Sequence, residues 1–157
     1  MSPEIYLLTE HLYKKPRTDP SVSEEIIFRL GFTTPPDYVE TMREFNGGEG
    51  LIGDQNHLEI WKVQDLFPRN EKYEADKYAE GYFVFASNAG GMAYAFSKKT
   101  SFIVSFELVG MLIADEPIVL GQNLLEFLRY IIAPKIYLKL PDMEKNTTVI
   151  VFRCICA

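Results

Sequence analysis

The residues that could support chemistry in this chain are a glycine cluster, two histidines and a large set of carboxylates. The glycine cluster lies in REFNGGEGLIG, residues 43–53, where Gly48, Gly50 and Gly53 form the pattern G-x-G-x-x-G. In a dinucleotide-binding protein this pattern follows a strand and opens a helix whose N-terminus holds a phosphate. Here a helical pattern precedes the glycines and short extended runs follow them. The cluster is therefore predicted to end a helix and turn the chain, and no cofactor is expected.

The histidines and carboxylates form no recognised catalytic or metal-binding motif. The two histidines are far apart in the sequence, and neither has neighbours at the spacing of metal ligands. Carboxylate pairs such as Glu49 with Asp54, or Glu107 with Asp115, could in principle carry out acid–base catalysis. Such pairs arise easily by chance among 22 acidic residues. We therefore expect a protein that is not an enzyme, with a small hydrolase that uses paired carboxylates as an alternative.

The negative charge of the chain is concentrated in its middle. Residues 37–80 contain 11 acidic and 5 basic side chains, an excess of −6 that equals the net charge of all 157 residues. Direct nucleic-acid binding requires a basic surface, and the sequence shows none. An acidic surface can instead steer a basic protein partner, although it can also serve only to keep the protein soluble.

Tyrosines are interleaved with acidic residues between positions 71 and 82. Tyrosine supplies contact area at interfaces and acidic residues accelerate encounter, so this pattern suits a protein-binding surface. A helix with one buried and one exposed face is the alternative. For the single tryptophan, Trp61, core packing is favoured over a role as a ligand platform. The candidate contact residues are Glu49, Asp54, Trp61, Glu74, Asp76 and Tyr82.

The N-terminal segment and the most apolar run argue against membrane targeting. MSPEIYLLTE has no basic region of the kind that opens a signal peptide. Residues 102–114 are too few to span a bilayer, and they include Glu107. Cys154 and Cys156 are expected to be reduced thiols. We expect a cytoplasmic protein without a membrane segment, and the sequence leaves a homodimer open.

The elements that must position these residues are helices at both ends of a run of strands. Helices are predicted over 21–30, with Ser21 as the cap, over about 35–45, over about 70–78, and from about 122 to the residue before Pro134. Short apolar runs separated by turn residues predict an antiparallel sheet. These runs cover 51–52, 58–61, 82–86, 92–96, 102–108 and 117–120, with two further runs at 136–140 and 148–155. The predicted fold is a single α+β domain over residues 1–157, with a mostly antiparallel sheet flanked by helices.

An ordered series of short motifs resembles the SUKH superfamily, specifically its Smi/Knr-type family of cell-wall-assembly regulators. The series consists of GFTTPPDYVETMREFNGGEGLIG, then LEIWKVQDL, then FVFASNAGGMAYAF. The matching positions are Pro36, Asp37, Tyr38, Phe45, Asn46, Gly47, Gly48, Trp61, Phe85, Gly90 and Gly91. The resemblance covers about residues 20–132 and leaves 133–157 as a C-terminal extension.

This resemblance implies a function in protein binding. Bacterial members of the family are implicated as immunity proteins that neutralise polymorphic toxins, often nucleases, which implies a basic toxin domain as the partner. Fungal members are implicated in glucan synthesis, which implies a regulator or scaffold as the alternative. Neither branch is known for catalysis, in agreement with the expectation from the residues.

Overall fold

The computed structural model describes residues 1–107, 117–133, 136–137 and 151–152. The helices are α1 (Pro3–Leu8), α2 (Pro20–Arg29), α3 (Pro36–Glu44), α4 (Leu66–Lys72), α5 (Ala75–Tyr78) and α6 (Leu124–Ile132), and a 3₁₀ turn, η1, covers Val63–Asp65. The main sheet contains β1 (Tyr13–Lys14), β2 (Gly48–Ile52), β3 (Asn56–Ile60), β4 (Tyr82–Ser87), β5 (Met92–Ser97), β6 (Ile103–Glu107) and β7 (Ile118–Gly121).

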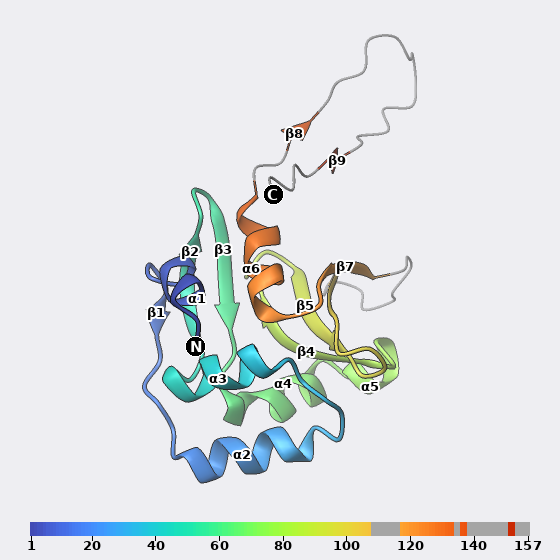
Figure 1. Ribbon diagram of the computed structural model, residues 1–157. Helices are drawn as coiled ribbons and strands as arrows, with labels where there is room; N and C mark the ends of the chain where they lie inside the picture. The colour runs from blue at the N-terminus through green and yellow to red at the C-terminus, as the bar shows by residue number, and fades with distance from the viewer. Residues whose placement is uncertain (108–116, 134–135, 138–150, 153–157) are drawn as a thin grey trace.

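The seven strands form one sheet in the order in which they occur along the chain. Every neighbouring pair is antiparallel, from β1 beside β2 to β6 beside β7. Helices α3 and α6 lie across one face of this sheet, and α2 lies beyond α3 (Figure 1). The predicted α+β fold with an antiparallel sheet is therefore confirmed. In the C-terminal region, β8 (Ile136–Tyr137) pairs with β9 (Val151–Phe152), and the rest of both predicted runs lies outside the described residues.

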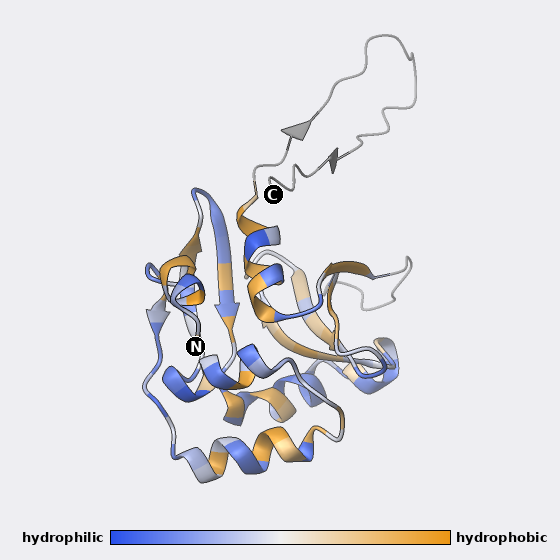
Figure 2. Ribbon diagram, in the orientation of Figure 1, coloured by the Kyte–Doolittle hydropathy of each residue, from blue (hydrophilic) through white to orange (hydrophobic). Residues whose placement is uncertain are grey.

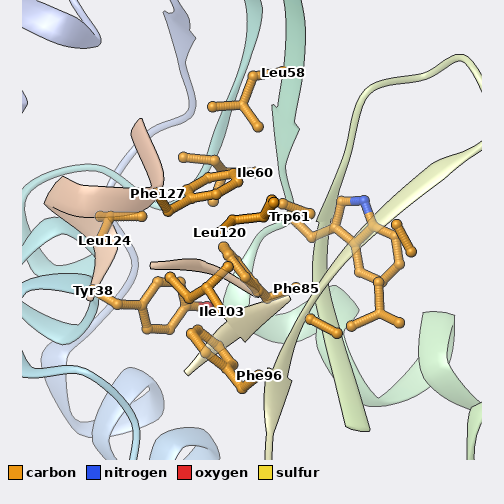
Figure 3. Close-up of a cluster of buried hydrophobic side chains, with 14 of the residues drawn as sticks. Tyr38, Leu58, Ile60, Trp61, Phe85, Phe96, Ile103, Leu120, Leu124 and Phe127 are labelled. Atoms are coloured by element: carbon orange, nitrogen blue, oxygen red, sulfur yellow. The ribbon is translucent and has the colours of Figure 1, made fainter. Parts of the chain in front are cut away.

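The core on the helix-covered face is built from closely packed aromatic rings (Figure 3). Phe85 of β4 and Phe96 of β5 stack with their ring centroids 4.2 Å apart. Tyr38 of α3 meets Phe96 edge-on at 4.9 Å, and Phe127 of α6 meets Phe85 at 5.9 Å. These four rings are fully buried and join the two helices to the centre of the sheet.

Two motif positions hold the fold together through side chain to backbone hydrogen bonds. The carboxylate of Asp37 accepts hydrogen bonds from the N–H groups of Leu124 and Leu125 at 3.1 and 2.9 Å, so it adds to the N-terminal capping of α6. From the sequence, Asp37 was expected only to lie at the start of its own helix, α3. Asn46 is buried, and its side-chain oxygen accepts a hydrogen bond from the N–H of Val63 at 3.0 Å.

The glycine cluster behaves as predicted at its start but not throughout. Helix α3 ends at Glu44, and Gly47 turns the chain with a positive φ of 77°. The next two glycines of the cluster, Gly48 and Gly50, lie within β2 rather than in a turn. A Cβ atom at either position would come within 3.1 Å of a backbone carbonyl oxygen of residues 11–13. Their missing side chains therefore let the N-terminal segment pass close to the sheet.

Several boundaries differ from the prediction. The first 20 residues contain α1 and β1, neither of which was predicted from the sequence. Asp19, not Ser21, caps α2, because its carboxylate accepts the Ser21 N–H at 2.9 Å. The predicted helix over 70–78 is two helices, divided where Glu74 adopts a left-handed conformation with φ of 50°. Within the described ranges, no helix has the length and apolar character needed to cross a bilayer.

Candidate protein-binding face

Strands β2 and β3 present alternate residues to the two faces of the sheet, as extended chains must. Leu58 is fully buried on the helix-covered face, so its neighbours His57 and Glu59 lie on the opposite face. On β2, Glu49 and Leu51 are the exposed positions between buried or half-buried ones. The register places Glu49 opposite Glu59 and Leu51 opposite His57. One face of this hairpin is therefore apolar and covered by helices. The other face carries both polar and apolar side chains and is partly open to solvent.

Strand β1 extends the open face by one strand. Tyr13 lies directly opposite Glu49, and residues opposite each other on antiparallel strands project to the same face. Tyr13 is 70% exposed and Leu51 is 55% exposed, which is unusual for large apolar side chains on a sheet. We call the surface formed by Tyr13, Glu49, Leu51, His57 and Glu59 the outer face.

The outer face carries two carboxylates that stand directly across from each other. Like charges in this position destabilise a sheet, and here each carboxylate has a basic neighbour. The Nζ of Lys15 lies 3.0 Å from Glu49, and an Nη of Arg69 lies 2.8 Å from Glu59. The Ser87 hydroxyl also donates to Glu59 at 3.2 Å. The Glu49 side chain is 47% exposed and that of Glu59 23%, so Glu49 is the more accessible of the two.

Trp61 lies beneath the outer face and is buried from solvent. Its indole ring is 1% exposed and stacks on Tyr73 at 6.1 Å, while the guanidinium of Arg69 lies 4.8 Å from the ring centroid. The ring lies apart from the Phe85 and Phe96 cluster (Figure 3). Core packing, which the sequence favoured for Trp61, is confirmed. As a candidate contact residue, Trp61 can act only indirectly, by holding the arginine that pairs with Glu59.

Helix α4 is fixed next to this surface by a buried asparagine. The Asn70 side chain accepts from the Val84 N–H at 2.9 Å and donates to the Val84 carbonyl at 2.8 Å. It also donates to the Leu66 carbonyl at 2.8 Å. Asn70 thereby pairs with β4 as another strand would, and this anchors α4 against the sheet. Arg69 precedes Asn70, so the anchor also fixes the position of the arginine.

The other candidate contact residues do not join the outer face. Asp54 is exposed in the turn between β2 and β3. Glu74 and Asp76 lie at α5, where Asp76 contacts the Nζ of Lys98 at 2.9 Å. Tyr82 begins β4, and its ring packs 6.0 Å from that of Phe106.

The β2–β3 turn and α5 lie at opposite ends of the molecule (Figure 1). The six candidate residues therefore do not converge on one site. Glu74, Asp76 and Tyr82 belong to the region around α5 and the start of β4, whereas Glu49 belongs to the outer face and Trp61 lies beneath it.

Most of the outer face was not predicted from the sequence. Leu51 and Glu59 were detectable, because the alternation of small or apolar with polar residues over 48–52 and 56–60 is typical of a half-buried strand. Tyr13 had no comparable signal, because β1 is only two residues long and its partner is distant in the sequence.

Of the two carboxylate pairs that could in principle carry out catalysis, the structure describes both members of only one, Glu49 with Asp54. Glu49 contacts Lys15, and Asp54 lies in the following turn, whereas Asp115 lies outside the described residues. In the part of the chain that the structure describes, no group of three or more His, Cys, Asp or Glu side chains is arranged to hold a metal ion.

These features define a small α+β protein with one helix-covered and one partly open sheet face. The model of the SMI1/KNR4 family (SUKH-1) matches residues 22–130, which is most of the chain. The chain therefore belongs to this family, as its motif series indicated. A search of curated proteins finds no match.

Proposed function

We propose that this protein binds another protein through the outer face, and that it acts in the cytoplasm as an immunity protein that neutralises a basic toxin domain. The observation that carries the proposal is the combination of exposed Tyr13 and Leu51 with the facing carboxylates Glu49 and Glu59. Membership of the SMI1/KNR4 family supports this role at the level of the family.

The apolar residues of the outer face supply binding energy and the acidic residues supply selectivity. Burying Tyr13 and Leu51 against a partner would remove two large apolar side chains from water, at about 25 cal/mol per Å² of apolar area. The pair of Glu49 with Lys15 is at the surface, so a partner lysine or arginine could share Glu49 or take the place of Lys15 beside it.

Neutralisation by this protein needs no reaction of its own. A bound partner would have its basic surface covered, and a nuclease that loses its basic surface cannot hold a nucleic acid backbone. The excess negative charge of residues 37–80 would speed the encounter with such a surface. The hydrolase alternative predicts instead a turnover that a single carboxylate substitution abolishes.

A regulator or scaffold in glucan synthesis is the second candidate, favoured by the match to the SMI1/KNR4 model. It would use the same face to bind a protein that is not a toxin. Co-expression separates the two candidates. The immunity role predicts that cells producing a candidate toxin domain survive when they also produce this protein, and that a Tyr13→Ser/Leu51→Ser variant fails to protect them. Equal killing with and without the wild-type protein, for every toxin domain encoded beside it, would contradict the immunity role.

A further inference from the structure

Helix α2 carries an exposed phenylalanine beside an apolar hollow. Phe28 is 87% exposed, more than any other large apolar side chain in the described ranges. It borders a hollow of about 240 Å³ between α2 and α3. Apolar residues are visible along α2 in Figure 2. The more deeply buried residues of the hollow are Ser23, Ile27, Val39 and Met42.

The rim of the hollow is charged but locally neutral. Glu24 of α2 and Arg43 of α3 both line it, and an Nη of Arg43 lies 3.2 Å from the Glu24 carboxylate. Both side chains are at least half exposed, at 61% and 50%. The ion pair is therefore accessible and can exchange partners at little cost, because exposed pairs contribute about 1 kcal/mol or less.

We propose that this surface, formed by Phe28, Glu24, Arg43 and the hollow, binds a second copy of the chain around a two-fold axis. Such an interface uses the same patch on both copies, so the patch must contain both a projection and a recess. Phe28 is the projection and the hollow is the recess. Each Phe28 enters the hollow of the other copy, and each Glu24 faces the Arg43 of the other copy.

The charge distribution favours a second copy on this surface. Two chains that each carry a net charge of −6 repel each other, and contact is least costly where the local charge is balanced. The pair formed by Glu24 and Arg43 provides this balance and makes the patch complementary to itself. A strongly basic or strongly acidic partner would gain nothing from such a rim.

The dimer surface is separate from the outer face. Helix α3 packs on the other side of the sheet, through the contacts of Tyr38 with Phe85 and Phe96. Self-association through α2 and α3 therefore leaves Tyr13 and Leu51 accessible. The inference does not depend on the proposed function, and one dimer would present two outer faces.

Sedimentation velocity of the full chain, from micromolar to millimolar concentration, tests this proposal. We expect a concentration-dependent dimer, because a patch with a single aromatic anchor gives a weak interface. Phe28→Ser should raise the dimer dissociation constant at least tenfold, whereas the matched control Leu51→Ser, an exposed apolar residue of the outer face, should leave it unchanged. Thermal unfolding of both variants checks that they remain folded.

Two charge reversals test the two-fold arrangement itself. Glu24→Arg and Arg43→Glu should each weaken the dimer, since each variant places like charges across the axis. A mixture of the two variants should restore association, because each variant then meets its complement. A wild-type chain that stays monomeric at all concentrations would overturn the proposal. So would a dimer that Phe28→Ser leaves unchanged, or reversals that do not rescue each other.

Discussion

The carboxylate of Asp37 accepts a hydrogen bond from the N–H of Leu124 at 3.1 Å, across 87 residues of sequence. The second carboxylate oxygen accepts from the N–H of Leu125 at 2.9 Å. A residue at the start of α3 therefore satisfies the free N–H groups at the start of α6, and the two helices are locked on the same face of the sheet. Asp37 of the PPDY segment therefore links its own helix to the start of α6.

Asp37→Ala should lower the free energy of unfolding by about 1–2 kcal/mol, because two partly buried N–H groups at the start of α6 lose their acceptor, although Asn123 still caps the helix. Urea denaturation followed by circular dichroism measures this change. Asp54→Ala is the matched control: it removes an exposed carboxylate from a turn, and should change stability by less than about 0.5 kcal/mol. Equal effects of the two substitutions would show that the Asp37 contact does not stabilise the fold.

Gly47 and Gly31 are a matched pair of positions that tests how far close packing excludes a side chain. Both have a positive φ, of 77° and 73°. A Cβ at Gly47 would lie 2.5 Å from the Ile60 carbonyl oxygen, whereas a Cβ at Gly31 would meet nothing within 4 Å. Gly31→Ala should therefore lower the free energy of unfolding only by the backbone strain, about 1–2 kcal/mol. Gly47→Ala should lower the free energy of unfolding clearly more. Equal losses of stability in the two variants, measured by thermal unfolding, would contradict a role for close packing at Gly47.

The ion pair between α1 and α6 predicts a dependence of stability on pH. The Glu4 carboxylate lies 2.6 and 2.7 Å from Nε and Nη of Arg129, and this hydrogen bonding lowers the pKa of Glu4. Because the folded state favours the ionised carboxyl group, its contribution is present above the ordinary pKa of about 4.3 and is lost as the pH falls through the lowered value.

Glu4→Gln should accordingly be slightly less stable than the wild type at neutral pH and equal to it in strong acid. The difference should be small, because both side chains are exposed. Denaturant titrations of both proteins at the two pH values measure it. A stability difference that is the same at both pH values would show that the charge of Glu4 is not responsible.

The sequence predicted the parts of the fold that local patterns determine. The strands from β3 to β7 and the end of β2 were visible as short apolar runs between turn residues, and α6 was visible between Asn123 and Pro134. The α1 helix and β1 were missed, because they are too short for a periodic pattern to show. β1 pairs with β2 at a close approach that depends on Gly48, a contact that no local pattern reveals.

The candidate site was harder to predict because it depends on register. Glu49 was chosen for its charge, but its cross-strand neighbours Tyr13 and Glu59 follow only from the pairing of β1, β2 and β3. The acidic excess of residues 37–80 was read from the sequence as one feature. The structure distributes it over α3, the outer face, the β2–β3 turn and the region of α4 and α5, where Asp76 pairs with Lys98.

Affinity purification with mass spectrometry tests the binding claim most directly. Three immobilised baits are compared at low salt in an extract of the cells that naturally make the protein. They are the wild type, the outer-face variant Tyr13→Ser/Leu51→Ser, and Phe28→Ser as a control with another exposed apolar residue changed elsewhere. We predict that the wild type and Phe28→Ser retain the same basic polypeptide and that the outer-face variant loses it. Recovery of no polypeptide by the wild type, or equal recovery by the outer-face variant, would contradict the proposed function.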